Sequence, residues 1–363
     1  MSMTTASDTI AAADAGRLLR KERRFARINK AAGWLDALGF AWVTPLLKIA
    51  AGDNVGEQLG ELKRVLLIPL LGIGMFILAW GMLAPRVDTS LGALPGPAQV
   101  WEQAQNLFAD HHAERAKEAA FYARQEERNA ALAAAGKPEE VKWRAYTGKP
   151  TFFDQILTSL KTVGLGFIIA TLLAVPLGIA CGLSRTLNGA INPLIQLFKP
   201  VSPLAWLPIV TMIVSALYVN PSDAMPKALL ISAITVTLCS LWPTLINTAL
   251  GVASIDKDLV NVGKVLQLST LTTIRKLVLP SALPLIFTGL RLSLGVGWMV
   301  LIAAEMLAQN PGLGKFVWDE FQNGSSFSLA RIMVAVLTIG IIGFMLDRVM
   351  YALQSAFTFQ PNR

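Results

Sequence analysis

Cysteine, histidine and charged residues are all scarce in this sequence. It holds 2 cysteines and 2 histidines in 363 residues, and 15% of its residues are charged, against about a quarter in soluble domains. Cys181 and Cys239 both lie in apolar segments, which argues against a disulfide framework and favours simple packing. His111 and His112 adjoin in a charged stretch with no cysteine nearby, so we expect no metal site.

The residue sets of an enzyme are also missing. No Ser-His-Asp set and no paired carboxylates stand out, and both histidines lie in one polar stretch. The nearest mimic of a phosphate-binding loop runs from Gly312 to Lys315, but it lacks the first glycine and Phe316 follows where Ser or Thr is needed. We therefore predict no catalytic residue, no metal and no cofactor bound by this chain.

The sequence is instead rich in apolar residues, which make up 53% of it. Six apolar stretches are long enough to cross a bilayer of about 30 Å. An isolated strand leaves backbone groups unpaired in lipid, so all six are expected to be helices. This predicts an all-α, polytopic membrane protein whose transmembrane helices lie at about Val65–Ala84, Ile156–Leu183, Val201–Tyr218, Ala228–Ala249, Leu283–Ala304 and Leu329–Leu353.

Basic residues set the expected orientation. The net charge is +8, and the Lys and Arg residues flank apolar runs, which favours membrane topology over nucleic-acid binding. They are dense between Arg17 and Arg64, so we expect both termini to be cytoplasmic. We expect no cleavable signal peptide, because no apolar run of sufficient length follows the basic stretch Arg17–Lys30. The predicted parts are a basic segment 1–64 with an interfacial helix at Ala37–Ala50, a first span 65–84, an outer insert 85–155, a transmembrane domain 156–353 and a cytoplasmic tail 354–363.

The outer insert is expected to be helical in its first half. Trp101–Ala135 is rich in Ala, Glu, Gln and Arg, which are strong helix formers. The second half of the insert is punctuated by Gly136, Pro138, Gly148 and Pro150. The insert is either a solvated helical segment or a platform that touches an extracytoplasmic partner.

The loop from Ser254 to Pro284 carries most of the functional information. Ser254 or Asp256 can cap a helix that begins near Lys257. Leu259, Val262 and Leu266 then share one face, because they are spaced by three and four residues. Ser269 or Thr270 can cap a second short helix, which Pro280 and Pro284 are expected to limit. The apolar face of the first helix lies either on lipid headgroups or in a groove of a soluble subunit.

This loop, 254–284, resembles the coupling loop of ABC importer permeases, the EAA loop. With Leu279 and Pro280 on the closing Leu-Pro of that pattern, the Glu-Ala-Ala positions hold Asn261, Val262 and Gly263, and Gln267 stands where the family has glycine. The departures at Asn261 and Gln267 narrow the resemblance to the nitrate-type permeases, relatives of the sulfonate and taurine permeases. Other stretches resemble that branch over about Leu66–Ala352, outside the insert at about 110–150: Leu94–Gln99, Lys199–Ile209, Ile286–Leu307 and Gly312–Trp318.

The resemblance implies a type I importer permease in the bacterial inner membrane. Its partners would be two cytoplasmic ATP-binding subunits that hold ATP and Mg, a second permease copy, a periplasmic or lipid-anchored substrate-binding protein, and membrane lipid; no nucleic acid is expected. Nitrate or nitrite is the expected cargo, with sulfonate, taurine, bicarbonate or cyanate as alternatives. A secondary transporter or channel is the competing class, although it should show more intramembrane carboxylates or inverted halves.

Three residues of the fifth span are candidates for the translocation pathway. Arg291 lies about two turns inside the span, where a cation lowers the barrier for an anion or snorkels to the headgroups. Glu305 sits at the outer end, where its charge would repel an anion, so gating, helix packing or an interfacial place fits it better than ligand contact. Trp298 either lines the pathway or packs.

Overall fold

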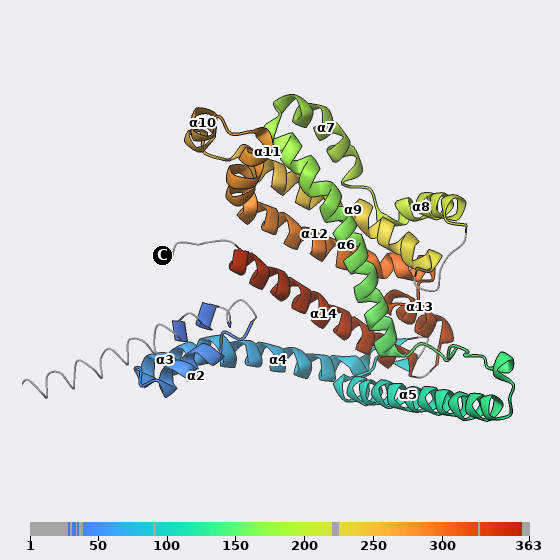
Figure 1. Ribbon diagram of the computed structural model, residues 1–363. Helices are drawn as coiled ribbons and strands as arrows, with labels where there is room; N and C mark the ends of the chain where they lie inside the picture. Colours follow the sequence, from blue (N-terminus) through green and yellow to red (C-terminus); the bar gives the residue numbers. More distant parts are fainter. Residues whose placement is uncertain are drawn as a thin grey trace, which may run out of the picture. The chain divides into compact units, whose positions relative to one another are not determined.

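The computed structural model describes residues 28–29, 31–33, 35, 39–89, 92–219, 225–325 and 327–357 (Figure 1). This part of the chain is helical apart from its connections and one two-stranded ribbon, which confirms the predicted class. It divides into two compact units. One contains the described residues up to Trp80 and those from Phe344 onward, and the other is Gly81–Gly343. The basic residues before position 28 and the tail after 357 lie outside the described residues.

The first unit begins with two short amphipathic helices, α2 (Val43–Ala50) and α3 (Val55–Leu62), which pack on each other. A π-helical turn, η1 (Lys63–Leu67), leads into α4 (Ile68–Leu83), whose C-terminal residues belong to the second unit. From Val55 to Arg86 the chain is one long helix that is apolar enough to span a membrane. This confirms the first predicted span, and α2 covers the end of the predicted interfacial segment.

The second unit is built on α9 (Lys227–Ala253), which packs along both α6 (Phe152–Leu183) and α12 (Leu279–Ala308) (Figure 1). With α14 (Ser328–Phe357), these helices coincide with the second, fourth, fifth and sixth predicted spans. Their contacts are tight because glycines face α9. A Cβ added at Gly178 would lie 2.6 Å from Cβ of Thr248, and one at Gly182 would lie 2.5 Å from Cβ of Val252. These two small residues therefore let the helix backbones approach closely.

The third predicted span, Val201–Tyr218, coincides with the second helix of a bent pair. The chain forms α7 (Arg185–Phe198) and α8 (Pro203–Leu217), whose axes differ by 102°. With 15 residues, α8 is shorter than the roughly 20 residues that a span requires. Five described helices are long enough to span a membrane, and a sixth span exists when α7 and α8 are counted as one. Pro200 and Pro203 bracket the bend, as expected for residues that cannot continue a helix.

The prediction that Pro280 and Pro284 limit the second loop helix is wrong. After α10 (Lys257–Val265), the chain runs through α11 (Thr270–Thr273) and the π-helical turn η4 (Ile274–Val278) straight into α12. The whole stretch Thr270–Ala308 is one helical run. The π-helical turn shifts the hydrogen-bond register just before Pro280, because the Leu279 amide donates to the Ile274 carbonyl, and so accommodates the missing proline amide.

The predicted insert is a long helix with a strap running back along it. After η2 (Ala84–Arg86) and the ribbon of β1 (Asp88–Thr89) and β2 (Gly92–Ala93), helix α5 spans Pro97–Ala134 and η3 covers Pro138–Glu140. The Gln125 amide exchanges hydrogen bonds with the Arg144 backbone at 2.8 and 2.7 Å. The Tyr146 hydroxyl donates to Glu114 at 2.8 Å, which lowers the pKa of the Glu114 carboxyl. The expected helix at Trp101–Ala135 is therefore confirmed.

Candidate functional site

The loop after α9 folds as a short helix held against the base of α12. The Asp256 carboxylate caps α10 by accepting a hydrogen bond from the Asp258 amide at 3.0 Å. Gly263 is buried, and a Cβ there would lie 3.0 Å from Cδ1 of Leu277 in η4. A small residue at position 263 therefore lets α10 rest directly on the π-helical turn that leads into α12.

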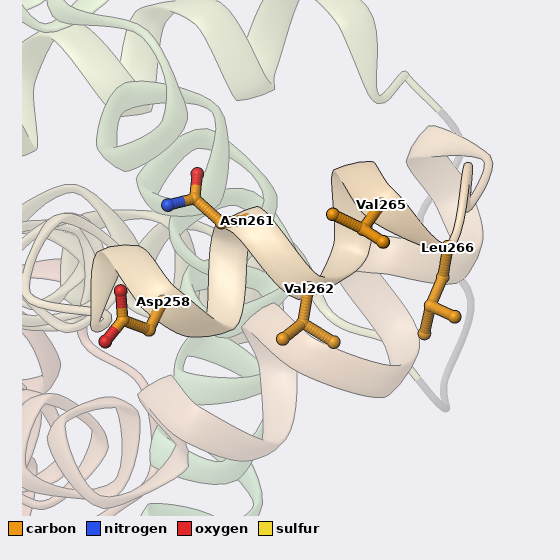
Figure 2. A pocket seen from close by; sticks show the side chains of 5 residues that line it. All are labelled: Asp258, Asn261, Val262, Val265 and Leu266. Atoms are coloured by element: carbon orange, nitrogen blue, oxygen red, sulfur yellow. The ribbon is translucent and has the colours of Figure 1, made fainter.

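The other side of α10 presents uncovered apolar residues. Leu259, Val262 and Leu266 are exposed as the sequence spacing predicted, with Leu266 63% exposed. Figure 2 shows Val262 and Leu266 pointing the same way from the helix. A hollow of about 400 Å³ is lined by Asp258, Asn261, Val262, Val265 and Leu266. Val265 was not among the predicted residues, and it is the most exposed of these apolar side chains at 81%.

The end of α10 explains why glycine suits position 267. The Leu268 amide donates to the Gly263 carbonyl at 3.1 Å, which closes a Schellman motif after the helix. That motif requires the intervening residue to adopt the left-handed conformation, and Gln267 has φ of 50°. Gln267 thus occupies, with a side chain, the backbone conformation that glycine adopts without steric penalty.

Replacing Gln267 with glycine is expected to stabilise the loop. A left-handed non-glycine residue costs about 1–2 kcal/mol, and the greater entropy of glycine offsets part of the gain. We expect a net gain of about 0.5–1 kcal/mol, measured as slower amide hydrogen exchange over 254–270. Gln196→Gly is the matched control, because Gln196 lies in the interior of α7, where glycine should speed exchange. Faster exchange over 254–270 in Gln267→Gly would show that the left-handed backbone at Gln267 is not strained.

The second half of the loop fixes it to the transmembrane helix. Ser269 caps α11 through a hydrogen bond that its hydroxyl accepts from the Thr272 amide at 3.4 Å. Leu279 packs against a buried cluster of Val252, Val278, Ala282 and Ile286, which joins α9 to α12. Pro280 lies in the first turn of α12, where the shifted hydrogen-bond register of η4 accommodates its missing amide. The loop is thus packed continuously onto the base of α12.

Within α12, Arg291 lies on a side that α9 does not cover. Gly289 and Ser293 face α9: a Cβ at Gly289 would lie 2.9 Å from Cα of Thr244, and the Ser293 hydroxyl accepts from the Thr244 amide at 3.0 Å. Arg291 is two positions from each, so it leaves the helix about 200° away. Gly295 and Met299 continue this side at intervals of four, and both are exposed.

Trp298 and Glu305 have contacts inside the chain. Trp298 is buried, and its indole nitrogen donates to the Ile339 carbonyl of α14 at 3.0 Å. Glu305 is fully buried near the other end of α12 and meets Ser159 of α6. The three predicted pathway residues are seven positions apart in α12 and therefore lie along one side of the helix. Trp298 and Glu305 are buried there, whereas Arg291 is half-buried.

A cavity of about 220 Å³ lies at the opposite end of α12 from α10. Its walls come from α5, the start of α6, α14 and α13 (Leu313–Asn323). Arg331 pairs there with Glu320 at 3.4 Å and with Asp110 at 3.5 Å, and Lys149 and Gln155 also line it. Among the residues that the structure describes, no group of His, Cys, Asp or Glu has the arrangement of a metal site.

Comparison with known proteins gives consistent matches. Residues 174–358 match the family described as "Binding-protein-dependent transport system inner membrane component". The bicarbonate transport system permease protein CmpB of Synechococcus elongatus is 36% identical over 80% of this chain and 88% of its own length. The nitrate import permease protein NrtB of the same species is 36% identical over 57% of this chain and 73% of its own.

One solved structure is similar in fold. A chain of the MetNI methionine ABC transporter, in an inward-facing conformation, superposes with a TM-score of 0.50. It covers 57% of this chain and 96% of that one, with 12% sequence identity. At this identity the likeness concerns the fold alone, and that fold is the type I ABC importer permease fold.

Proposed function

Because this chain belongs to the family of binding-protein-dependent transport system inner membrane components, we propose that it forms the pathway through which an ATP-driven importer takes up nitrate or bicarbonate. It is a multi-pass permease subunit of an ABC importer, and the ATPase of such importers is a separate subunit. ATP-binding subunits and a substrate-binding protein complete the machine. The cargo, a second copy of this chain, the lipid contacts and the orientation with both termini in the cytoplasm are parts of the proposal.

The exposed apolar face of α10 is the observation that carries the coupling role. Val262, Val265 and Leu266 surround a hollow, while Gly263 rests on the helical turn that continues into α12. An amphipathic helix of this kind fits a groove on a soluble subunit, and a rigid connection to α12 is what force transmission requires. If α10 lay on lipid headgroups instead, the same face would be covered, but no force from an ATPase would reach α12. Leu259, Val262 and Leu266 then form the exposed face that docks on an ATP-binding subunit. The coupling loop as a whole is assigned to the following residues: Leu259, Asn261, Val262, Gly263, Leu266, Gln267, Ser269, Leu279 and Pro280.

The two similar relatives support a small planar anion as cargo. One is named for bicarbonate and one for nitrate, at the same sequence identity, and both anions carry one negative charge on a planar group of oxygens. The bicarbonate relative matches over a larger share of this chain. Sulfonate, taurine and cyanate are the alternative cargoes for the same machinery.

Uptake by proteoliposomes that contain the complete importer tests the cargo. Labelled nitrate and labelled bicarbonate are offered in turn. Each is tested against an excess of one unlabelled competitor at a time, namely the other anion, a sulfonate or cyanate. We expect ATP-dependent uptake of nitrate or bicarbonate that a sulfonate does not compete away. Uptake of a sulfonate but of neither planar anion would contradict the proposed cargo and leave the importer assignment intact.

Arg291 is the residue of this chain that we propose to serve the anion directly. It is half-buried on a side of α12 that does not face α9, and the exposed Gly295 leaves space one turn along. A cation in the apolar part of a membrane is expensive and is usually retained for function. Arg291→Gln should slow anion uptake about tenfold, a barrier change of about 1.4 kcal/mol, without loss of assembly. Arg291→Lys is the matched control that keeps the charge; equal rates in wild type and Arg291→Gln would remove Arg291 from the pathway.

A further inference from the structure

Helix α13 begins without a capping side chain of its own. Its N-cap residue is Gly312, and no side chain of the capping position bonds the first turn. The first amides, which have no partner inside the helix, instead bond to two other helices. The Leu313 amide donates to the Ser159 hydroxyl of α6 at 2.8 Å, and the Gly314 amide donates to the Glu305 carboxylate of α12 at 3.0 Å.

The Glu305 carboxylate joins these bonds into one cluster. Its oxygens lie 2.9 and 2.8 Å from the Ser159 hydroxyl, and the Asn310 side-chain amide lies 3.5 Å away. Asn310 also donates to the Thr162 hydroxyl of α6 at 3.0 Å. All four side chains are 0% exposed, so the cluster of Glu305, Ser159, Asn310 and Thr162 is shielded from bulk solvent, which strengthens its hydrogen bonds.

A buried carboxylate needs compensation for its lost hydration. None of the ion pairs among the described residues involves Glu305. The compensation comes from the amide and hydroxyl donors and from the N-terminus of α13, where the helix dipole places partial positive charge. Such an arrangement fixes both the position and the direction of α13, because the first-turn amides must point at the carboxylate.

Two glycines make room for this contact. A Cβ at Gly312 would overlap the Glu305 carboxylate, and a Cβ at Gly314 would overlap the Ile302 carbonyl oxygen. The Gly-Leu-Gly sequence at 312–314, which has the look of an incomplete phosphate loop, is therefore explained by the approach of α12 to the start of α13.

We propose that Glu305 is a positioning residue for transport: with Ser159 it clamps the N-terminus of α13, so that α13 and the outer ends of α6 and α12 move as one body. This inference rests on the proposed function, in which the α13 end of the bundle faces outward. Helix α13 packs on α12 and α6, at the opposite end from α10 (Figure 1). It also forms one wall of the 220 Å³ cavity. Movement of α12, driven from the coupling loop, then carries the outer surface with it.

The test uses the complete importer in proteoliposomes, with hydrogen exchange of 310–323 and uptake per ATP hydrolysed as the two measurements. Glu305→Ala should speed exchange of the first turn of α13 at least tenfold and lower uptake per ATP about fivefold or more, while ATP hydrolysis continues. Glu305→Gln should lie between, because its amide oxygen still accepts from the Gly314 amide. Gly314→Ala should reproduce the alanine variant without changing any charge. Asp319→Asn is the control, because Asp319 bonds Lys315 at the surface of the same helix.

If Glu305→Ala fails to assemble, Ser159→Ala takes its place, since it removes the acceptor of the Leu313 amide and leaves the carboxylate. Unchanged exchange in these variants would overturn the clamp. Faster exchange with unchanged uptake per ATP would overturn its role in transport and leave only packing. A wild-type importer without uptake would instead count against the proposed function, so the two failures are distinguishable.

Discussion

Leu266→Asp is expected to release the ATP-binding subunits from the permease while the membrane domain stays folded. Leu266 is 63% exposed and lines the hollow on α10 with Val262 and Val265. A charge placed in an apolar contact loses the burial energy and must itself be desolvated. We expect a loss of at least about 2 kcal/mol of binding energy, which is roughly a thirtyfold rise in Kd. Pull-down of the ATP-binding subunit with the detergent-solubilised permease measures it.

Two further variants sharpen this experiment. Val265→Asp should act like Leu266→Asp, because Val265 is 81% exposed on the same hollow. Trp143→Asp is the matched control: Trp143 is 65% exposed but lies in the strap of the insert, away from the coupling loop. An undiminished complex with both loop variants would mean that α10 does not dock, and the lipid-surface interpretation of its apolar face would replace it.

Gly166→Val is expected to disrupt the membrane domain itself. Gly166 is buried where α6 crosses α9, and an added Cβ would lie 2.8 Å from the Ala233 carbonyl oxygen and 2.9 Å from Cγ1 of Val236. The Gly166 carbonyl also accepts a hydrogen bond from the Thr237 hydroxyl at 3.0 Å. A valine must push the two helices apart, which costs about 3 kcal/mol or more, at the upper end of overpacking effects. The melting temperature and the yield of monodisperse protein in detergent measure this loss.

Gly164 provides the matched control on the same helix. It lies two positions from Gly166, and a Cβ there would have nothing within 4 Å. Gly164→Val should therefore keep its melting temperature within a few degrees of wild type. If both variants lowered the melting temperature equally, valine would be acting on the α6 helix itself and not on its contact with α9. If neither variant lowered it, α6 and α9 would not be in close backbone contact at Gly166.

Hydropathy and residue type were sufficient to predict the transmembrane helices, because a span of about 20 apolar residues leaves no other structure possible. The same pattern did not reveal the bend between α7 and α8, since a count of apolar residues carries no direction. The prediction that Pro280 and Pro284 end the second loop helix was also wrong. Their effect depends on whether the preceding turn can change its hydrogen-bond register, and η4 does so with ordinary residues whose sequence carries no distinct signal.

The coupling loop was predictable because its chemistry is local. Caps at Asp256 and Ser269 and the spacing of Val262 and Leu266 are properties of a few neighbouring residues. Val265 was not predicted, although it lies three residues after Val262 and therefore flanks the same apolar face. The left-handed backbone at Gln267 was visible only as a departure from the family glycine, and its physical meaning required the Schellman geometry.

The Glu305 cluster could not be derived from the sequence. Ser159 and Glu305 are 146 positions apart, and the sequence around each residue gives no sign of a contact with the other. Gly312 and Gly314 were a signal, since two glycines around one leucine suggest a close approach of backbone to another group. Identifying that group as a carboxylate of α12 required the tertiary structure.

Reconstitution with and without the ATP-binding subunits tests whether transport through this chain depends on a separate ATPase. Liposomes containing this chain and its binding protein are compared with liposomes that also contain the ATP-binding subunits and ATP, and uptake of labelled nitrate and bicarbonate is measured. We predict uptake only when both the ATP-binding subunits and hydrolysable ATP are present, and its loss in Leu266→Asp. Uptake at an equal rate by this chain without those subunits would contradict the importer assignment and identify a self-sufficient transporter or channel.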